Sequence, residues 1–204
     1  MFSVAETPQG ALLRPLLLAS SSRYRQQLLS RLQVPFDSCS PDIDETPMPG
    51  EGAEQLVRRL AEHKARALAT SHPNHLIIGS DQVAVLDQKI LGKPGSTERA
   101  KEQLQAASGK SVRFLTGLAV LDSATGRTQV DCVPFTVHFR TLDEALIERY
   151  ISIDQPFDCA GSFKAEGLGI RLFRATEGTD PTSLIGLPLI RLTDMLLNEG
   201  IEIP

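Results

Sequence analysis

Cysteine is scarce in this chain, and its spacing excludes two common kinds of site. Three cysteines occur in 204 residues, an odd number without a Cys-X-X-Cys pair. Such a scattered set favours neither a disulfide framework nor a cysteine-based zinc site. The four histidines also lack an HExxH pattern. A reducing cytoplasm is the simplest setting for this composition, and we expect a cytoplasmic protein.

Long apolar runs and a strong charge of one sign are missing too. No segment approaches the roughly 20 apolar residues that span a bilayer, so we expect no membrane segment. The net charge of −4 argues against a general nucleic-acid-binding protein. Residues 1–15 lack the basic start and apolar block of a signal peptide. We expect them to form a poorly ordered extension, and residues 16–204 to form a single domain.

The standard phosphate-binding motifs are also absent. Gly109, Lys110 and Ser111 resemble the end of a P-loop, but position 104 is Leu where the first glycine is required. The glycines at positions 167 and 169 do not continue into a dinucleotide-binding fingerprint. A phosphate site would therefore have to be assembled from residues scattered along the chain.

Hydrophobic periodicity and turn residues predict mixed strands and helices. Strands are expected at residues 16–19, 36–40, 77–86, 112–121 and 129–140, the last two forming a hairpin. Helices are expected at 23–32, 53–70, 94–108, 145–153 after a capping box at 141–144, and 188–198. Residues 159–173 are expected to be strand and loop. The fold class is α/β with α+β character: a mixed twisted sheet flanked by helices, with two lobes around a central cleft, divided near Gly109.

A carboxylate in the middle of an apolar strand is the first candidate for chemistry. Asp81 interrupts the apolar run at residues 77–86. An unpaired buried carboxylate is costly, so an Asp in this position usually faces a cation, a metal ion or a proton-transfer task.

Cations also lie on otherwise apolar helix faces. Lys64 shares a face with Leu60 and Leu68 at four-residue spacing. Its stem could lie along the edge of the core while the ammonium reaches water, or the ammonium could serve a site. Arg25 follows a serine cap in the first turn of its helix, where the helix dipole favours anions.

The positive charge of Arg25 opposes the helix dipole, and a bound anion would remove this repulsion. Ser20 and Ser22, the exposed backbone N–H groups and Arg25 could together hold a phosphate, although a plain serine cap with a surface arginine is the commoner arrangement. In the next loop, Asp42, Asp44 and Glu45 could be solvated charges or, with Asp81, ligands of Mg²⁺ or Mn²⁺. Lys93 is held in extended backbone by the following proline and could reach a phosphate or remain a loop lysine.

Seven short segments in order resemble the Maf family of nucleoside triphosphate pyrophosphatases. They are LASSSRYR (18–25), DET (44–46), KA (64–65), GSDQV (79–83), GKP (92–94), TG (116–117) and GSFKAEG (161–167). The resemblance implies hydrolysis between the α- and β-phosphates of a nucleoside triphosphate, with a divalent metal cofactor, Mg²⁺ or Mn²⁺, and a possible homodimer. It assigns Asp81 as proton acceptor, Glu45 and Asp81 to the metal, Lys64 and Lys93 to catalysis, and Ser20, Ser22, Arg25 and Thr116 to the substrate.

Three residues are similar to the branch of the family typified by YceF, which is associated with 7-methyl-GTP. They are Tyr24, in place of an arginine, Gln82 after the catalytic Asp, and Glu166. A methylated guanine carries positive charge, which would stack on Tyr24 and pair with a carboxylate such as Glu166. The resemblance implies formation of 7-methyl-GMP and diphosphate, which keeps modified nucleotides out of nucleic acids. Arg23 stands where the family usually has proline, and its effect does not follow from the sequence.

Two other functions are consistent with the same residues. One is a dTTP/UTP pyrophosphatase of the same family, which usually carries an arginine pair and a different residue after the Asp. The other is a nucleotide-binding regulator of cell division that does not turn its ligand over. A regulator has little need for a base such as Asp81, which favours the enzyme.

Overall fold

The computed structural model describes residues 14–204 of the chain. The expected extension therefore lies outside the described residues, except for its last two. Arg14 pairs with Asp122 at 2.7 Å, and Pro15 accepts a hydrogen bond from the backbone of Leu76 at 3.0 Å. Within residues 14–204, no helix is long and apolar enough to cross a membrane.

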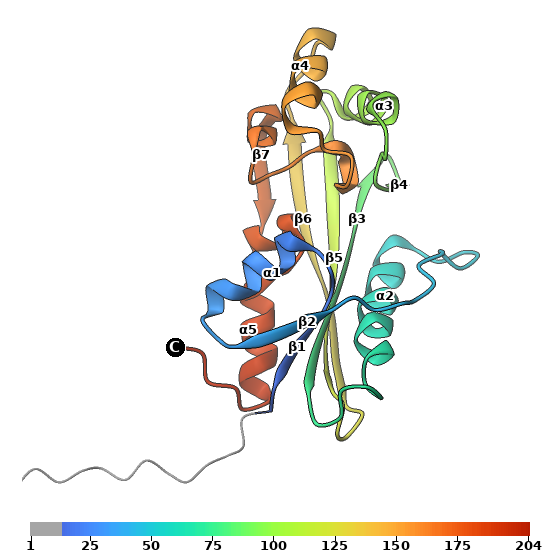
Figure 1. The fold of residues 1–204 in the computed structure, drawn as a ribbon. Coiled ribbons are helices and arrows are strands. Elements are labelled where there is room, and N and C mark those ends of the chain that lie inside the picture. The colour runs from blue at the N-terminus through green and yellow to red at the C-terminus, as the bar shows by residue number, and fades with distance from the viewer. Residues whose placement is uncertain (1–13) are drawn as a thin grey trace, which may run out of the picture.

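A seven-stranded mixed sheet forms the centre of the molecule (Figure 1). Its strands are β1 (Leu16–Ala19), β2 (Phe36–Cys39), β3 (Leu76–Leu86), β4 (Lys89–Leu91), β5 (Ser111–Asp122), β6 (Thr128–Phe139) and β7 (Phe173–Gly178). The order is β2-β1-β3-β5-β6-β7, and β4 pairs with β3. Strands β1, β2 and β3 are parallel, whereas the pairs from β3 to β7 are antiparallel. The predicted mixed sheet and its β5–β6 hairpin are confirmed.

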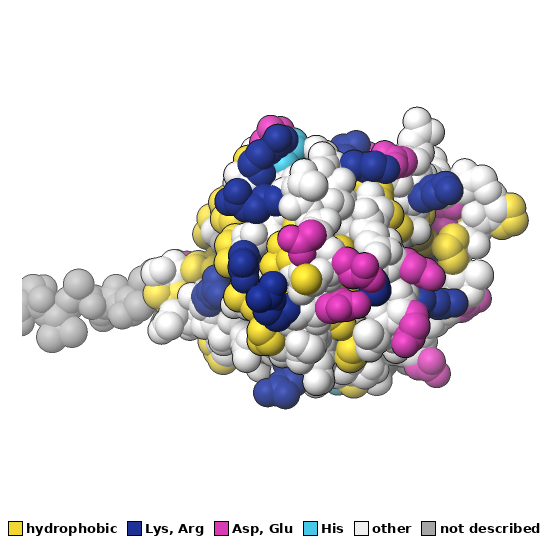
Figure 2. Space-filling view, turned by 90° about the horizontal axis from the view of Figure 1, so that it is seen from above, with side chains coloured by type: hydrophobic (Ala, Val, Ile, Leu, Met, Phe, Trp, Pro, Cys, Tyr) yellow, Lys and Arg dark blue, Asp and Glu magenta, His cyan; other side chains and the backbone are white. Residues whose placement is uncertain are grey.

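Helices cover both faces of this sheet. Helix α2 (Ala53–Ala67) lies on one face, and α1 (Arg23–Leu29) and α5 (Leu189–Asn198) lie on the other (Figure 1). Helices α3 (Thr97–Ala107) and α4 (Glu144–Asp154) pack at one end. The view of that end shows basic and acidic side chains interspersed (Figure 2). The five predicted helices are confirmed to within a few residues.

Two details of the predicted elements are wrong. The cap of α4 is Asp143, whose side chain accepts from the backbone of Leu146 at 2.7 Å, so the capping box at 141–144 does not form. Residues 159–173 contain the 3₁₀ turns η2 (Ala160–Ser162) and η3 (Leu168–Leu172) in place of a strand. The strand begins only at Phe173, and the backbone before it leaves the extended conformation at Gly161 and Ser162, which both have positive φ.

Four hydrophobic clusters pack against the sheet among the described residues: two hold α2 on one face, and two larger cores lie along the strands. One of the larger cores packs α1 and α5 on Leu76, Ile78 and the end of β5, and the other packs α3 and α4 on Ala84 and Phe114. Strands β3 and β5 contribute to both cores, so the expected division of the lobes near Gly109 is wrong. The lobes share long strands because an 11- or 12-residue strand is long enough to support two cores.

Helix α2 approaches the sheet unusually closely at two glycines. A Cβ on Gly79 would lie 2.0 Å from the carbonyl oxygen of Ala61, and a Cβ on Gly117 would lie 2.0 Å from that of Val57. No other residue fits at either position without moving the helix. This contact brings α2 within side-chain reach of the middle of β3.

Candidate active site

A gap in the pairing of β3 positions the candidate site. Strand β1 pairs with β3 only as far as Ile78, and β4 pairs only from Ala84 onward. Between these points one edge of β3 is open in the described sheet. The next residues, Asp81 and Gln82, point to opposite faces because side chains alternate along a strand. Side chains from both faces can therefore meet at this edge.

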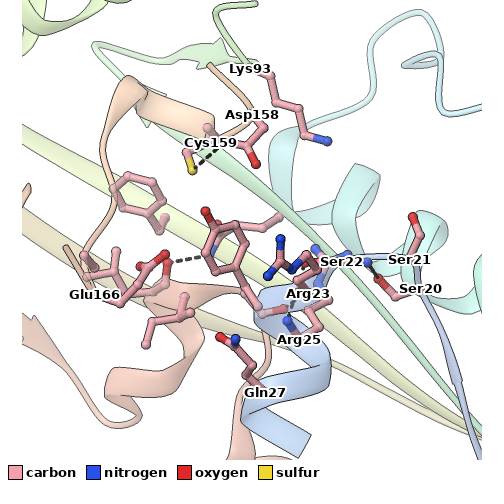
Figure 3. Close-up of a pocket in the computed structure, with 18 of the residues that line it drawn as sticks. Ser20, Ser21, Ser22, Arg23, Arg25, Gln27, Lys93, Asp158, Cys159 and Glu166 are labelled. Carbon is pink, nitrogen blue, oxygen red and sulfur yellow. Dashed lines mark hydrogen bonds between the residues drawn. The ribbon is translucent and has the colours of Figure 1, made fainter. Parts of the chain in front are cut away.

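A cavity of about 640 Å³ opens at this gap (Figure 3). In Figure 3, Ser20, Ser22 and Arg25 lie on one side of the cavity and Glu166 on the other. Nine of the residues expected to form the site line its wall: Ser20, Ser22, Tyr24, Arg25, Glu45, Lys64, Gln82, Lys93 and Glu166. Asp81 lies directly behind Lys64, and Thr116 is buried beneath Gln82.

The turn between β1 and α1 forms the corner of the cavity that has the features of a phosphate-binding site. Ser22 caps α1, and its hydroxyl accepts from the backbone of Arg25 at 3.4 Å. The hydroxyl of Ser20 in turn accepts from the backbone of Ser22 at 3.1 Å. The predicted serine cap is confirmed, and it places two hydroxyls on the cavity wall.

Arg25 bends back from α1 and is fixed at one nitrogen only. Its Nε donates to the carbonyl oxygen of Gly186 at 2.8 Å. Burial lowers the pKa of Arg25, while the charges of Asp81 and Glu45 oppose that effect; a guanidinium remains charged nonetheless. Among the described residues, no hydrogen-bond acceptor faces its terminal nitrogens. They are available to an anion in the cavity.

Lys64 joins the two carboxylates expected at the reaction centre. Its Nζ lies 2.6 Å from Asp81 Oδ1 and 2.8 Å from Glu45 Oε1. Lys64 is 7% exposed and Asp81 8% exposed, so the ammonium does not reach bulk water. The sequence left open whether the Lys64 ammonium reaches water or serves a site, and the structure shows it buried between two carboxylates. The close approach of α2 at Gly79 and Gly117 makes this reach possible.

Glu45 comes from the loop before α2, and it alone of the three loop carboxylates lines the cavity. Burial opposes ionisation of Glu45, but the hydrogen bond and charge of Lys64, with Lys93 and Arg25, outweigh it and lower its pKa. Asp44 instead accepts from the backbone of Thr46 at 2.8 Å. Its carboxylate therefore stabilises the loop turn.

The same loop is tied to α2 by an ion pair. Arg59 contacts Glu51 at 2.6 Å and also donates to the carbonyl oxygen of Thr46 at 3.2 Å. Glu51 accepts from the backbone of Met48 at 3.0 Å. These contacts hold the loop that carries Glu45 against the helix that carries Lys64.

Gln82 presents its amide oxygen to the cavity. Its Nε2 lies 2.6 Å from the carbonyl oxygen of Ser183 and 2.9 Å from Thr116 Oγ1. Thr116 is fully buried and donates its own hydrogen to Ser183 at 2.9 Å. Thr116 therefore supports Gln82 beneath the cavity wall, and the substrate contact that the family resemblance implies for it stays a prediction.

The far end of the cavity is aromatic and acidic. Tyr24, Phe163, Asp158, Cys159 and Glu166 line it. Burial raises the pKa of Tyr24, and neighbouring Cys159 and Asp158 add to that effect, so its hydroxyl stays protonated at neutral pH. Two carboxylates, Asp158 and Glu166, line this end, and Lys164 lies beside the Tyr24 hydroxyl. The face of the Tyr24 ring is a surface on which a flat cation can stack.

Sequence reasoning missed Asp158 and the segment at residues 180–188, which includes Ser183 and Gly186. An available signal was Asp180-Pro181, a helix-capping residue followed by a proline at the first helical position. That signal predicts a short helical turn but does not reveal what its carbonyls face.

The carboxylates of the site are the donors that a divalent metal ion would need. No group of three or more His, Cys, Asp or Glu side chains converges among residues 14–204. The site offers two carboxylates, Glu45 and Asp81. Oε1 of Glu45 and Oδ1 of Asp81 both contact the ammonium of Lys64. Mg²⁺ characteristically takes one or two carboxylates and completes its shell with substrate phosphates and water. These residues fit such an ion.

The chain is similar to several named proteins along nearly its whole length. A 7-methyl-GTP pyrophosphatase from Pseudomonas fluorescens (strain Pf0-1) is 70% identical over 190 residues, covering 93% of this chain and 99% of the relative. The protein of that name from Pseudomonas aeruginosa is 69% identical over 189 residues, covering 93% and 98%. The one from Alcanivorax borkumensis is 61% identical, covering 93% and 96%.

Among solved structures, the fold is similar to that of a HAM1 protein from Coxiella burnetii. The TM-score is 0.54 at 15% identity, covering 90% of this chain and 98% of that one. The Staphylococcus aureus Ham1 protein gives a TM-score of 0.54 at 14% identity, covering 92% and 100%. The family model described as Maf-like protein matches residues 15–199. This chain belongs to the Maf family.

Proposed function

We propose that this protein is an enzyme that hydrolyses 7-methyl-GTP to 7-methyl-GMP and diphosphate. The observation that carries the proposal is the division of one cavity into two ends. Cations and paired carboxylates occupy one end, and an aromatic ring with carboxylates occupies the other. The relatives that share about 70% of the sequence carry the name 7-methyl-GTP pyrophosphatase.

The triphosphate would lie along the cationic end. Arg25, Lys93 and the hydroxyls of Ser20 and Ser22 line this end and can neutralise charge that develops on the phosphoryl oxygens. A Mg²⁺ or Mn²⁺ ion held by Glu45 and Asp81 would supply further charge stabilisation when bound.

In this proposal Asp81 accepts a proton from the attacking water. Lys64 holds Oδ1 of Asp81 at 2.6 Å, which fixes the carboxylate and leaves Oδ2 for the water. The ammonium also lies between the two carboxylates, so the cluster keeps its geometry before substrate binds. Orientation of this kind is a large part of general base catalysis.

The base would lie at the aromatic end. A 7-methylguanine ring carries positive charge, which the face of Tyr24 and the carboxylate of Glu166 both complement. Asp158 adds a second negative charge to the same end of the cavity. GTP lacks this positive charge, so the proposal predicts preference for the methylated nucleotide.

The test is a diphosphate-release assay with Mg²⁺ or Mn²⁺ over 7-methyl-GTP, GTP, dTTP and UTP. We expect 7-methyl-GTP to be the preferred substrate, and Asp81→Asn to lower kcat by about 10²–10⁴-fold because it removes the base. Calorimetry should show that Asp81→Asn still binds the nucleotide. Asp131→Asn, at an exposed ion pair on β6, is the matched control and should keep wild-type turnover.

Two results would contradict the proposal. Preference for dTTP or UTP would assign the chain to the other substrate class of the family. Nucleotide binding without release of diphosphate from any of the four would indicate a regulator without turnover. The homodimer that the resemblance implies stays a prediction, which sedimentation of the purified protein can check.

A further inference from the structure

The segment at residues 180–188 forms the part of the cavity wall behind Gln82. It connects β7 to α5 and contains the 3₁₀ turn η4 (Pro181–Ile185). Leu184, Ile185 and Gly186 from this segment line the cavity. It lies far from Gln82 in the sequence, yet its backbone contacts that side chain directly.

Asp180 fixes both ends of this segment. Its Oδ1 accepts from the backbone and the hydroxyl of Thr182, at 2.9 and 2.6 Å. Its Oδ2 accepts from the backbone of Ile190 at 2.8 Å, in the first turn of α5. One carboxylate that is 2% exposed therefore caps η4 and α5 together.

Thr182 also links Asp180 to the start of α5. Its hydroxyl accepts from the backbone of Leu189 at 2.8 Å while donating to Asp180. Ser183 adds a hydrogen bond from its hydroxyl to the carbonyl oxygen of Asp180 at 2.7 Å. Since both ends of residues 180–188 are held in this way, the carbonyls between them have fixed directions.

Those carbonyls determine how the amide of Gln82 is oriented. The oxygens of Ser183 and Leu184 lie 2.6 and 3.2 Å from its Nε2. Carbonyl oxygens can only accept, so the amide nitrogen must face them and the amide oxygen must face the cavity. Reversing the amide would set its oxygen against two carbonyls. Gln82 therefore enters the cavity as an acceptor.

An acceptor at this point selects among bases. The Watson–Crick edge of guanine carries two adjacent donors, N1–H and the N2 amino group, whereas thymine and uracil carry one donor between two carbonyls. Together with the carboxylate of Glu166, the Gln82 oxygen gives two acceptors for two donors. This step rests on the proposed function, because it takes the base to lie at this end of the cavity.

We propose that Asp180 is a positioning residue for base selection. It acts through the backbone of residues 183 and 184 to keep the Gln82 oxygen in the cavity. The carbonyl of Gly186 in the same segment also accepts from Arg25 Nε at 2.8 Å, so the segment connects the base end to the phosphate end.

The primary test is Asp180→Asn, whose amide N–H must face the backbone N–H of either Ile190 or Thr182, so that one of the two caps is lost. We expect the ratio of kcat/KM for 7-methyl-GTP over dTTP to fall about tenfold, the effect of one lost hydrogen bond to the base. The ratio for 7-methyl-GTP over GTP should stay within about twofold, since both bases carry the N1–H and N2 donors.

A double variant separates positioning from a general loss of stability. If Asp180 acts through Gln82, Asp180→Asn should lower the 7-methyl-GTP to dTTP ratio no further in a Gln82→Ala background. Asp122→Asn is the matched control, because Asp122 is also 2% exposed and accepts from a backbone N–H and a threonine hydroxyl at 3.0 and 2.8 Å. That variant should lose stability but keep the ratio.

If Asp180→Asn does not fold, Thr182→Val and Thr182→Ser give the same comparison. Valine removes the hydroxyl that joins Asp180 to α5 and should lower the ratio, while serine restores the hydroxyl and the ratio. An unchanged ratio in folded Asp180→Asn or Thr182→Val, or additive effects in the double variant, would overturn the inference. A wild-type enzyme that prefers pyrimidine nucleotides would instead contradict the proposed function.

Discussion

The two ends of the cavity are built from different kinds of structure. Side chains on regular elements form much of the phosphate end: Arg25 on α1, Lys64 on α2 and Asp81 on β3. The base end depends on 3₁₀ turns and on the segment at residues 180–188, where backbone carbonyls orient Gln82. The positions of the charged groups at the phosphate end therefore depend on the packing of helices against the sheet. The choice of base depends on the hydrogen bonds that cap irregular segments.

The largest effect should come from breaking the ion pair at the phosphate end. Lys64→Met leaves Asp81 without its buried partner, which we expect to lower the free energy of unfolding by about 3–5 kcal/mol. It should also lower kcat at least as much as Asp81→Asn does. Chemical denaturation and the diphosphate-release assay measure the two effects separately.

The double variant Lys64→Met with Asp81→Asn sharpens that test. Removing the charge of Asp81 as well should restore most of the lost stability, since no uncompensated buried charge remains. Activity should stay absent. Recovery of activity together with stability would show that the pair only supports the fold.

A smaller effect is expected at the base end. Tyr24→Ala should raise KM for 7-methyl-GTP by the equivalent of about 1–3 kcal/mol, the usual range for one base stacked on an aromatic ring. kcat should change little, because the proposed contact of Tyr24 is with the base and not with the phosphates. Tyr24→Phe keeps the ring and is the matched control, with KM near the wild-type value. A larger loss in kcat than in KM would place Tyr24 in the chemistry instead.

Much of the phosphate end could be predicted from the sequence. Asp81 stands out because a carboxylate interrupts an apolar strand, and Lys64 because helical spacing places it on a buried face. Both signals are local. The role of Gln82 was not predictable in the same way, because its orientation depends on carbonyls of residues 183 and 184, about 100 positions away.

The contacts of Thr116 also depend on residues far away in the sequence. Its motif resemblance implies a substrate contact, and the pairing of β3 with β5 sets it opposite Gln82, where its hydroxyl is used within the protein. The lobe division near Gly109 failed for a related reason. Gly109 marks a turn in the chain, whereas the cores follow strand registers that no single segment reveals.

The smallest expected effect lies at the edge of the phosphate end, in the loop that carries Glu45. Hydrogen bonds from Arg59 and from the backbone of Met48 lower the pKa of Glu51 from its ordinary value of 4.5 to about 2. A carboxylate with a lowered pKa stabilises the folded loop above its unfolded pKa, and that contribution disappears as the pH falls from 4.5 through about 2. The backbone amide of Met48 should report this directly in an NMR titration, with a midpoint near pH 2.

Glu51→Gln should abolish that titration and weaken the attachment of the loop. Because neither Glu51 nor Arg59 lines the cavity, the pair affects substrate only through the loop. We therefore expect KM for 7-methyl-GTP to rise only about twofold at neutral pH, with kcat unchanged. Glu54→Gln removes an exposed pair with Arg58 on the same helix and should change neither the Met48 titration nor KM. A fall in kcat in Glu51→Gln would mean that the loop ion pair also sets the position of Glu45 relative to Lys64. The phosphate end would then depend on an irregular segment as much as the base end does.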